Sequence, residues 1–266
     1  MSEPRASQQP ELPDLIVDRR EAVVEVTFNR PHRRNAFTKA MYAEMGELWR
    51  ELAGDASVRV VVLRGEGGKA FAAGNEISDF LEADAVDYET WIRQMLDGLF
   101  SLPQVTIAAI DGVCVGGGLA VATNVDLRVA TAGSRFGYPI ARTLGNALSS
   151  PVLYRCAAVF GESLTREMLL ASRLVAADRA YAAGALTAVA ADRAALDAEV
   201  DALVEGILQA SPVTLRTTKQ QLAARAALTE TAPADEEALL REVYGGPDFA
   251  EGVRAFLAKE KPAFRG

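Results

Sequence analysis

The chain has 266 residues, half of them hydrophobic, and a formal net charge of −8 at pH 7. This length supports one extended domain with a large core, and the acidic balance makes nucleic acids and anionic membranes poor partners, so that any anionic ligand needs a local cluster of cations. Two widely separated cysteines and a single histidine exclude a zinc or haem motif, which predicts a metal-free protein of a reducing, cytoplasmic compartment.

The N-terminal residues Met1–Pro13 are polar and rich in Pro, Ser and Gln. Because they contain no apolar segment, we expect a disordered tail, and neither a signal peptide nor a membrane anchor. From Ala22 to Phe28 the apolar and polar residues alternate, which is typical of a half-buried strand that ends before Pro31.

Two amphipathic helices are expected in the next part of the chain. The first carries an apolar stripe at spacings of three and four residues, with an N-cap and a terminal glycine: Thr38, Met41, Met45, Leu48, Leu52 and Gly54. The second carries the stripe Trp91, Met95 and Leu99 and stops at Pro103.

Buried strands are predicted at Val58–Leu63 and Val105–Ile110. The apolar run from Val105 to Val125 is the longest of the chain, but Asp111 and several glycines interrupt it. We therefore expect no membrane span there.

The composition changes after Gly161, where Ala, Leu, Glu and Arg dominate and strand signals are lost apart from a short candidate at Ala188–Ala190. The stripe from Leu196 to Ile207 predicts an amphipathic helix, and Ser211 and Pro212 begin the next one. So much apolar helical surface has to pack on either the core or a neighbouring subunit.

Two segments suggest an anion-binding site for a developing oxyanion. Phe71–Ile77 and Asp111–Gly118 both place glycines after an apolar strand, where the backbone can approach a ligand closely. A helix that begins near Gly118 would point its unpaired N–H groups at the same place. Such an arrangement of donors is that of an oxyanion hole.

Five segments in one order carry a family resemblance. They are Asn29–Phe37 (Asn-Arg-Pro…Asn-Ala), Phe71–Ile77 (like Phe-x-Ala-Gly-x-Asp-Leu), Asp111–Gly118 (like Asn-Gly…Gly-Gly-Gly), Ala210–Lys219 (Ser-Pro…Thr-Lys) and Glu251–Phe264. Together they resemble the enoyl-CoA hydratase/isomerase (crotonase) superfamily over residues 14–266. The resemblance implies an α/β fold, a crotonase-like spiral of ββα units with a C-terminal helical trimerisation region, and thioesters of coenzyme A as substrates.

On this basis we divide the chain into a tail (1–13), a spiral core (14–195) and a helical C-terminal region (196–266). We expect a homotrimer or a dimer of trimers that binds no nucleic acid or membrane. No cofactor is expected beyond the coenzyme A of the substrate itself.

The resemblance also assigns residues. It makes the backbone N–H groups of Asn75 and Gly117 the oxyanion donors. The family's hydratases use two glutamates, whose positions are occupied here by Ala120 and by Ile140 after the Phe136–Pro139 turn. Since general acid–base help is worth about 10² to 10⁴ in rate, ordinary hydration should be slow.

Other side chains are candidates for the missing chemistry. The phenol of Tyr138 enters the pocket if the 138–140 stretch is extended, and Arg142, with Thr143 and Asn146, can bind a substrate group or orient water. Glu76 and Asp79 are the carboxylates nearest in sequence to Asn75. Core packing or solvation is the alternative for each of them.

The candidate coenzyme A contacts lie in three places: the loop Arg30–Arg34, here called the basic loop, the segment around Asn75 and the C-terminal end. They are Arg30, Arg33, Arg34, Ala73, Glu76, Ile77, Lys259 and Lys261. A solvated charge run is the alternative for the basic residues, and a solvated loop position is expected for His32.

Three functions remain open. The first is an acyl-CoA enzyme of this family, within fatty acid metabolism, that polarises a thioester carbonyl and has reduced hydratase (lyase) activity. The second is another reaction through a thioester enolate, by an isomerase, a decarboxylase or a hydrolase. The third is a non-catalytic acyl-CoA-binding protein.

Overall fold

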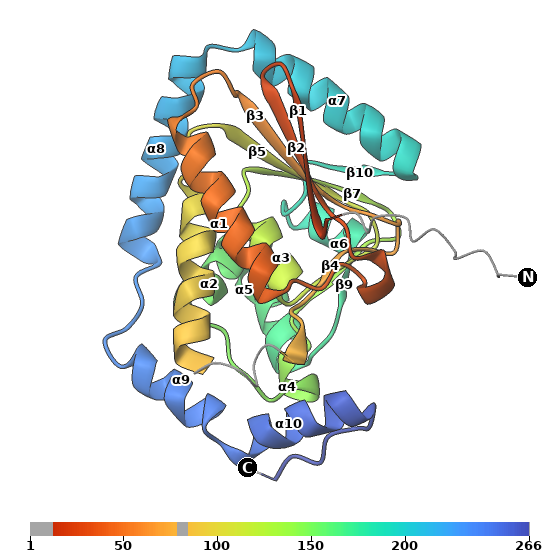
Figure 1. Ribbon diagram of the computed structural model, residues 1–266, viewed down its shortest axis with the longest axis vertical. Helices are drawn as coiled ribbons and strands as arrows, with labels where there is room; N and C mark the ends of the chain where they lie inside the picture. The colour runs from red at the N-terminus through yellow and green to blue at the C-terminus, as the bar shows by residue number, and fades with distance from the viewer. Residues whose placement is uncertain (1–12, 79–84, 266) are drawn as a thin grey trace, which may run out of the picture.

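The computed structural model describes residues 13–78 and 85–265 and is built around two sheets (Figure 1). The larger sheet has the strand order β1-β2-β3-β5-β7-β10. Its strands are β1 (Leu15–Arg20), β2 (Val23–Phe28), β3 (Val60–Gly65), β5 (Val105–Ile110), β7 (Leu127–Thr131) and β10 (Ala188–Ala190). Only the β1–β2 pair of this sheet is antiparallel. The sequence analysis placed four of these strands and missed β1 and β7.

A second, smaller sheet has the strand order β4-β6-β8-β9. It contains β4 (Ala70–Ala73), β6 (Val113–Val115), β8 (Arg135–Gly137) and β9 (Val175–Ala176). The chain alternates between the sheets, because each of β3, β5 and β7 is followed by a strand of the small sheet and then by a helix. These helices are α2 (Ala85–Phe100), α3 (Gly117–Thr123) and α4 (Ile140–Thr143). The expected ββα units are therefore present.

The central strands are buried on both faces. In β3, Val61 and Leu63 enter the main core, whereas Val60 and Val62 enter a second core on the opposite face. This two-sided burial explains the unbroken apolar run, since a parallel sheet covered by helices on both sides has no polar face.

Helices α1 (Lys39–Gly54), α2, α3 and α5 (Ser150–Leu170) cover the main core. In α1 the Thr38 side chain accepts a hydrogen bond from the N–H of Met41 at 3.2 Å, as expected for an N-cap. Helix α5 is interrupted at Gly161, which has φ of 74°. The short α6 (Ala177–Ala182) precedes β10.

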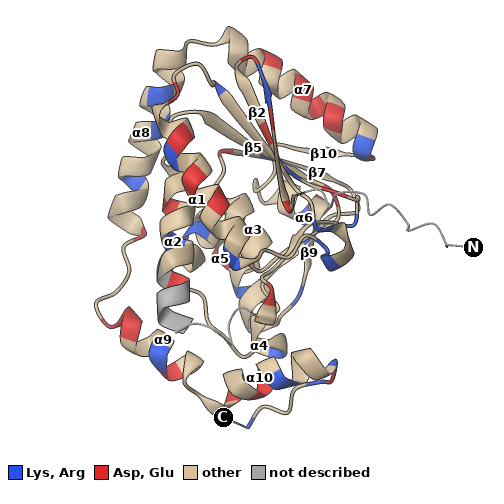
Figure 2. Cartoon of the chain, viewed as in Figure 1, with Lys and Arg blue, Asp and Glu red and all other residues tan. Residues whose placement is uncertain are grey.

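Helix α7 (Arg193–Gln209) covers the second core. Its stripe, with Leu196 and Val200 fully buried, packs on the large sheet of its own chain, and acidic residues lie along its outer side (Figure 2). Of the two packing surfaces that the sequence allowed for this stripe, the structure uses the core. The stripe is therefore no argument for a partner subunit.

The remaining helices, α8 (Pro212–Thr229), α9 (Glu236–Tyr244) and α10 (Pro247–Ala258), run down one side and across the lower end of the molecule (Figure 1). Lys219 ties α8 to the sheet: its ammonium group contacts Oδ2 of Asp126 at 2.5 Å, and the same oxygen accepts a 2.7 Å hydrogen bond from the N–H of Thr106. Within the described residues, no helix is both long and apolar enough to cross a membrane.

Candidate functional site

The loop after β4 contains an N–H group, that of Asn75, without an acceptor among the described residues. Phe37 forms a parallel bridge with Asn75, in which its N–H donates to the oxygen of Gly74 at 2.9 Å and its oxygen accepts from the N–H of Glu76 at 2.7 Å. The groups of Asn75 itself then point to the other side of the chain. Within the described part of the chain, the Asn75 N–H has no hydrogen-bond acceptor.

The second loop meets the first at Gly116 and Gly117, where α3 begins. Gly116 adopts φ of 54°, and a Cβ atom there would lie 3.1 Å from the Cα of Gly74. A Cβ atom on Gly117 would lie 2.3 Å from Oδ1 of Asn75. Only glycine permits this approach. Like that of Asn75, the Gly117 N–H donates to no acceptor among residues 13–78 and 85–265.

Tyr42 on α1 holds the Asn75 side chain. Its hydroxyl donates to Oδ1 of Asn75 at 2.6 Å, and its ring is fully buried. The sequence analysis did not single out Tyr42. The available signal was its position on α1 at spacings of three and seven residues before Met45 and Trp49, which are both buried.

The two loops open onto a largely apolar cavity of about 190 Å³. Ala120 and Ile140 both line it, so the two positions assigned to the absent glutamates face one space. Further apolar wall residues come from α2, from the segment after α4 and from α10: Ile92, Leu96, Leu148 and Phe256. The cavity is therefore suited to an apolar group next to two N–H donors.

Tyr138 and Ile140 both contribute to the cavity wall, but not in the extended backbone conformation on which the prediction for Tyr138 depended. Ile140 begins helix α4, so the 138–140 stretch is not extended, which was the condition for the predicted entry of the phenol; both residues nevertheless line the cavity. Tyr138 has no exposed surface, and burial raises the pKa of its phenol well above the usual value, so the group stays neutral. Its hydroxyl has no hydrogen bond of normal geometry within the described residues, although Thr123 lies close enough to interact.

Of the three polar residues predicted after Ile140, two line the cavity and one does not. Thr143 and Asn146 line the cavity, and Oδ1 of Asn146 is buried without a partner in the described part of the chain. Arg142 is exposed on α4 and does not contribute to the cavity wall. Asp79 lies outside the described residues.

Glu76 follows Asn75 in the chain, but its side chain contacts the arginines that follow β2 and is not part of the cavity wall. Its carboxylate pairs with Arg33 at 2.7 Å and with Arg30 at 3.2 Å. The hydrogen bond from Arg33, supported by that from Arg30, lowers the pKa of Glu76 despite its partial burial. Glu76 therefore stays ionised and neutralises part of the cationic cluster.

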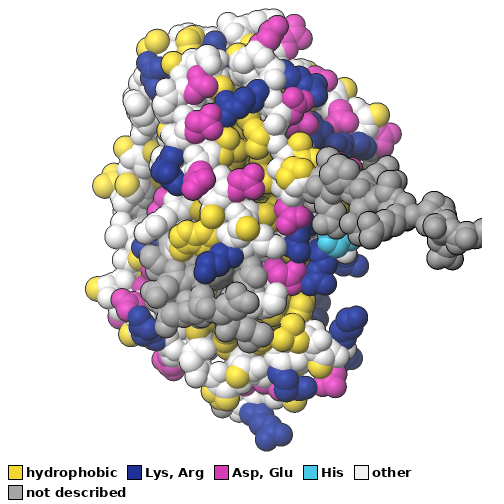
Figure 3. Space-filling model, viewed as in Figure 1, with side chains coloured by type: hydrophobic (Ala, Val, Ile, Leu, Met, Phe, Trp, Pro, Cys, Tyr) yellow, Lys and Arg dark blue, Asp and Glu magenta, His cyan; other side chains and the backbone are white. Residues whose placement is uncertain are grey.

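The remaining basic candidates are exposed. Arg34 makes no ion pair with any described residue, and its oxygen accepts a 3.0 Å hydrogen bond from the N–H of Ala73, which lines the cavity together with Ile77. Lys259 and Lys261 follow α10 shortly after Phe256. The single histidine, cyan in Figure 3, lies beside basic side chains on the surface, as expected for His32.

One carboxyl group of the cavity was missed. Glu89 lines it from α2, on the same helix face as Ile92 and Leu96. Its carboxyl oxygen lies 2.6 Å from the hydroxyl of Tyr244. Its spacing of three and seven residues from Ile92 and Leu96 could have indicated that it shares their helix face. Our prediction for α2 instead followed the neighbouring face with Trp91 and Met95, which lies towards α1.

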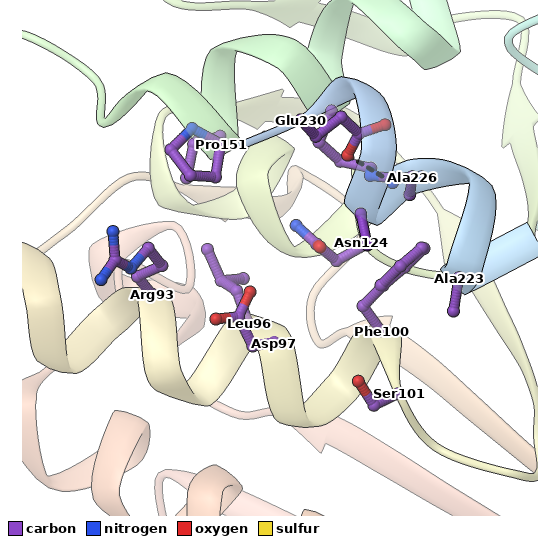
Figure 4. A pocket seen from close by; sticks show the side chains of 13 residues that line it. Arg93, Leu96, Asp97, Phe100, Ser101, Asn124, Pro151, Ala223, Ala226 and Glu230 are labelled. Carbon is purple, nitrogen blue, oxygen red and sulfur yellow. Dashed lines mark hydrogen bonds and ion pairs between the residues drawn. The ribbon is translucent and has the colours of Figure 1, made fainter. Parts of the chain in front are cut away.

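A second cavity of about 380 Å³ lies between α2, α5 and α8 (Figure 4). Arg93, Asp97 and Asn124 reach into it, and Arg155 pairs with Glu230 at its rim. Leu96 and Val152 line both this cavity and the first one. These two side chains are thus a shared wall.

Comparison with known proteins agrees with this fold of ββα units. The family model described as enoyl-CoA hydratase/isomerase matches residues 18–266. "Probable enoyl-CoA hydratase echA6" of Mycobacterium bovis is 31% identical over 92% of this chain and 97% of its own. An enoyl-CoA hydratase/carnithine racemase structure from Magnetospirillum magneticum has a TM-score of 0.77 at 35% identity and covers 96% of each chain.

A structure of methylmalonyl-CoA decarboxylase also aligns, with a TM-score of 0.85 at 25% identity, over 96% of this chain and 99% of the other. The fold is that of the crotonase superfamily. The chain belongs to the enoyl-CoA hydratase/isomerase family, whose members are acyl-CoA enzymes.

Proposed function

We propose that the protein binds acyl-CoA thioesters with the acyl group in the 190 Å³ cavity, and that the N–H groups of Asn75 and Gly117 form an oxyanion hole for the thioester oxygen. One observation carries this proposal: two N–H groups without an acceptor in the described residues lie on adjoining loops at an apolar cavity. Donors placed where negative charge develops are worth about 3 kcal/mol each.

The coenzyme A moiety is assigned to the surface beside the cavity. Arg34 is joined through its backbone to Ala73 in the cavity wall, and Lys259 and Lys261 follow Phe256. Glu76, in the segment around Asn75, orients Arg30 and Arg33 through ion pairs. These cations supply the local positive charge that phosphates need on an acidic protein.

The reaction proceeds through a thioester enolate rather than through two-glutamate hydration. Ala120 and Ile140 give the cavity wall no proton-transfer group at the two positions that hydratases of the family use. Stabilisation of the enolate oxygen, however, serves isomerisation, decarboxylation and hydrolysis as well. Slow or absent hydration is therefore part of this proposal.

Thermal melts with butyryl-CoA test the binding. The stabilisation should follow RT ln(1 + [L]/Kd), or about 2.7 kcal/mol at a hundredfold excess over Kd. Gly117→Ala should reduce turnover far more than binding, because its Cβ atom would meet Oδ1 of Asn75 at 2.3 Å. Gly133→Ala is the matched control, since no atom lies within 4 Å of a Cβ at that position.

A melt unchanged by millimolar acyl-CoA would refute the proposal. Binding without any turnover across enoyl, malonyl-type and saturated thioesters would instead favour a non-catalytic acyl-CoA-binding protein.

A further inference from the structure

Glu89 is the only carboxyl group that the described residues contribute to the wall of the first cavity. It shares that wall with Asn75, Gly117 and Ala120. Ile92 and Leu96, three and seven residues further along α2, are apolar, buried and line the same wall. A lone carboxyl on an apolar wall is either paired with another group or used for chemistry.

The partner of Glu89 is the hydroxyl of Tyr244, and the geometry around this hydroxyl allows two protonation states. The Tyr244 oxygen lies 2.6 Å from Oε1 of Glu89 and 3.0 Å from the oxygen of Ala147. A hydroxyl has one hydrogen to donate. Both contacts are hydrogen bonds at the same time only when Glu89 is protonated and donates to Tyr244, which then donates to Ala147.

When Glu89 loses its proton, the Tyr244 hydroxyl turns to the carboxylate and releases the Ala147 oxygen. Each state thus keeps the carboxyl group of Glu89 hydrogen-bonded. Tyr244 holds the Glu89 side chain in place whether or not it carries a proton, as a group that alternately accepts and donates a proton requires.

Burial and a neighbouring charge place the pKa of Glu89, and with it the change between its two protonation states, near neutral pH. Burial of the carboxyl, supported by the negative charge of Glu236 on α9, raises its pKa to about 7 despite the lowering effect of the Tyr244 hydrogen bond. Arg93, one turn after Glu89 on α2, faces Glu236 at 3.5 Å. Both forms of Glu89 are therefore populated at pH 7.

We propose that Glu89 is the catalytic acid–base of this site and that Tyr244 is its positioning residue. The inference rests on the proposed function, because it needs an acyl-CoA in the cavity. The Glu89 carboxylate takes a proton from the carbon next to the thioester carbonyl. The C–H bond breaks, its electron pair enters the enolate, and the negative charge moves to the oxygen held by Asn75 and Gly117. The neutral Glu89 then returns a proton to carbon, so that the enzyme is regenerated without a co-reactant.

Exchange of the α-hydrogens of butyryl-CoA with solvent deuterium, followed by mass spectrometry, measures this step for any overall reaction of the family. The wild-type protein should incorporate deuterium, and Glu89→Gln should slow incorporation by about 10² to 10⁴ while butyryl-CoA still raises the melting temperature. Asp97→Asn is the matched control. It removes a carboxyl from the same helix, at a position that lines the other cavity, and should leave the exchange rate unchanged.

Tyr244→Phe provides a second readout, which does not depend on how Glu89→Gln folds. Loss of a hydrogen bond that lowers the pKa of Glu89 should move the midpoint of the exchange-rate profile to higher pH. A purely structural tyrosine would change the rate without moving that midpoint.

Two results would overturn the inference and leave acyl-CoA binding intact. One is that the wild-type protein binds butyryl-CoA but exchanges no deuterium. The other is that Glu89→Gln exchanges at the wild-type rate. Failure of the proposed function looks different, since butyryl-CoA would then not stabilise the wild-type protein at all.

Discussion

The hydroxyl of Tyr42 donates a 2.6 Å hydrogen bond to Oδ1 of Asn75, and so fixes helix α1 to the loop whose Asn75 N–H has no acceptor among the described residues. The same hydroxyl would meet a Cβ atom on Gly117 at 2.5 Å. The Tyr42 hydroxyl is therefore in close contact with both the Asn75 loop and the start of α3 at Gly117.

Tyr42→Phe should keep the fold and reduce kcat by roughly tenfold with little change in KM, because small displacements of catalytic groups reduce rate more than binding. The loss of one hydrogen bond should cost about 1 kcal/mol of stability. Steady-state kinetics and urea unfolding measure the two effects. Tyr181→Phe, at a residue that is 52% exposed, is the control, and an equal loss of kcat there would contradict the argument.

Restoring carboxylates should create hydration. We expect Ala120→Glu with Ile140→Glu to raise the crotonyl-CoA hydration rate, since the acid–base share missing from the barrier is roughly 3 to 5 kcal/mol. The rescue should be partial, because Ala120 is 6% exposed and two carboxylates in an apolar wall suffer desolvation and mutual repulsion.

The matched control for this pair is Ala120→Gln with Ile140→Gln, which has nearly the same shape and no acid–base function. A wild-type kcat of hundreds per second for crotonyl-CoA would show that another residue already acts as the base for hydration. Ala120 and Ile140 would then not reduce hydratase activity.

Glu89 should make stability depend on pH in a defined direction. Its pKa is about 7 in the folded protein against an ordinary value of 4.5, so between these values the folded state holds a proton that the unfolded state has lost. This contribution is fully present below pH 4.5 and is lost as the pH rises through 7, by up to about 3 kcal/mol.

Glu89→Gln removes the titrating group, so its stability relative to wild type should increase from pH 4.5 to pH 7.5. Urea unfolding of both proteins across this range is the measurement. A difference in unfolding free energy that stays constant with pH would contradict the raised pKa.

The shared wall of the two cavities should limit acyl chain length. Leu96→Ala should join the 190 Å³ and 380 Å³ cavities and shift binding towards longer acyl-CoAs, at a stability cost of about 3 kcal/mol. Calorimetric titration with a series of chain lengths shows the shift. Leu99→Ala, on the same helix and fully buried but in neither cavity wall, should lose stability without changing the preferred length.

The sequence was most informative where local spacing determines structure. The period of α1 and its Thr38 cap were predicted because they depend on neighbours within one helical turn. The two glycine loops were recognised because backbone approach demands glycine there. Strand β1 was missed because Leu15–Arg20 ends in three charged residues and gains its order by pairing with β2.

Glu89 was missed for a different reason. Its partner Tyr244 lies 155 residues further along the chain, and no local pattern reports such a contact. The relative orientation of Tyr138 and Ile140 was predicted only on the condition of an extended stretch, but Ile140 begins a helical turn after Pro139, which has ψ of 25°. The position of its side chain therefore depended on a backbone turn that the residue types alone do not determine.

The described wall of the cavity draws on α1, α2, α3, α4, α5 and α10, with Phe256 as its most C-terminal contributor. A Cβ atom on Gly252 would lie 2.2 Å from the oxygen of Leu144, so α10 is seated against the segment that follows α4 with no room for a side chain between them. All the wall residues that the structure describes therefore come from one polypeptide. In an assembly prepared by mixing wild-type and inactive chains, activity should therefore fall in direct proportion to the inactive fraction, without the complementation or dominant loss that sites shared between chains produce.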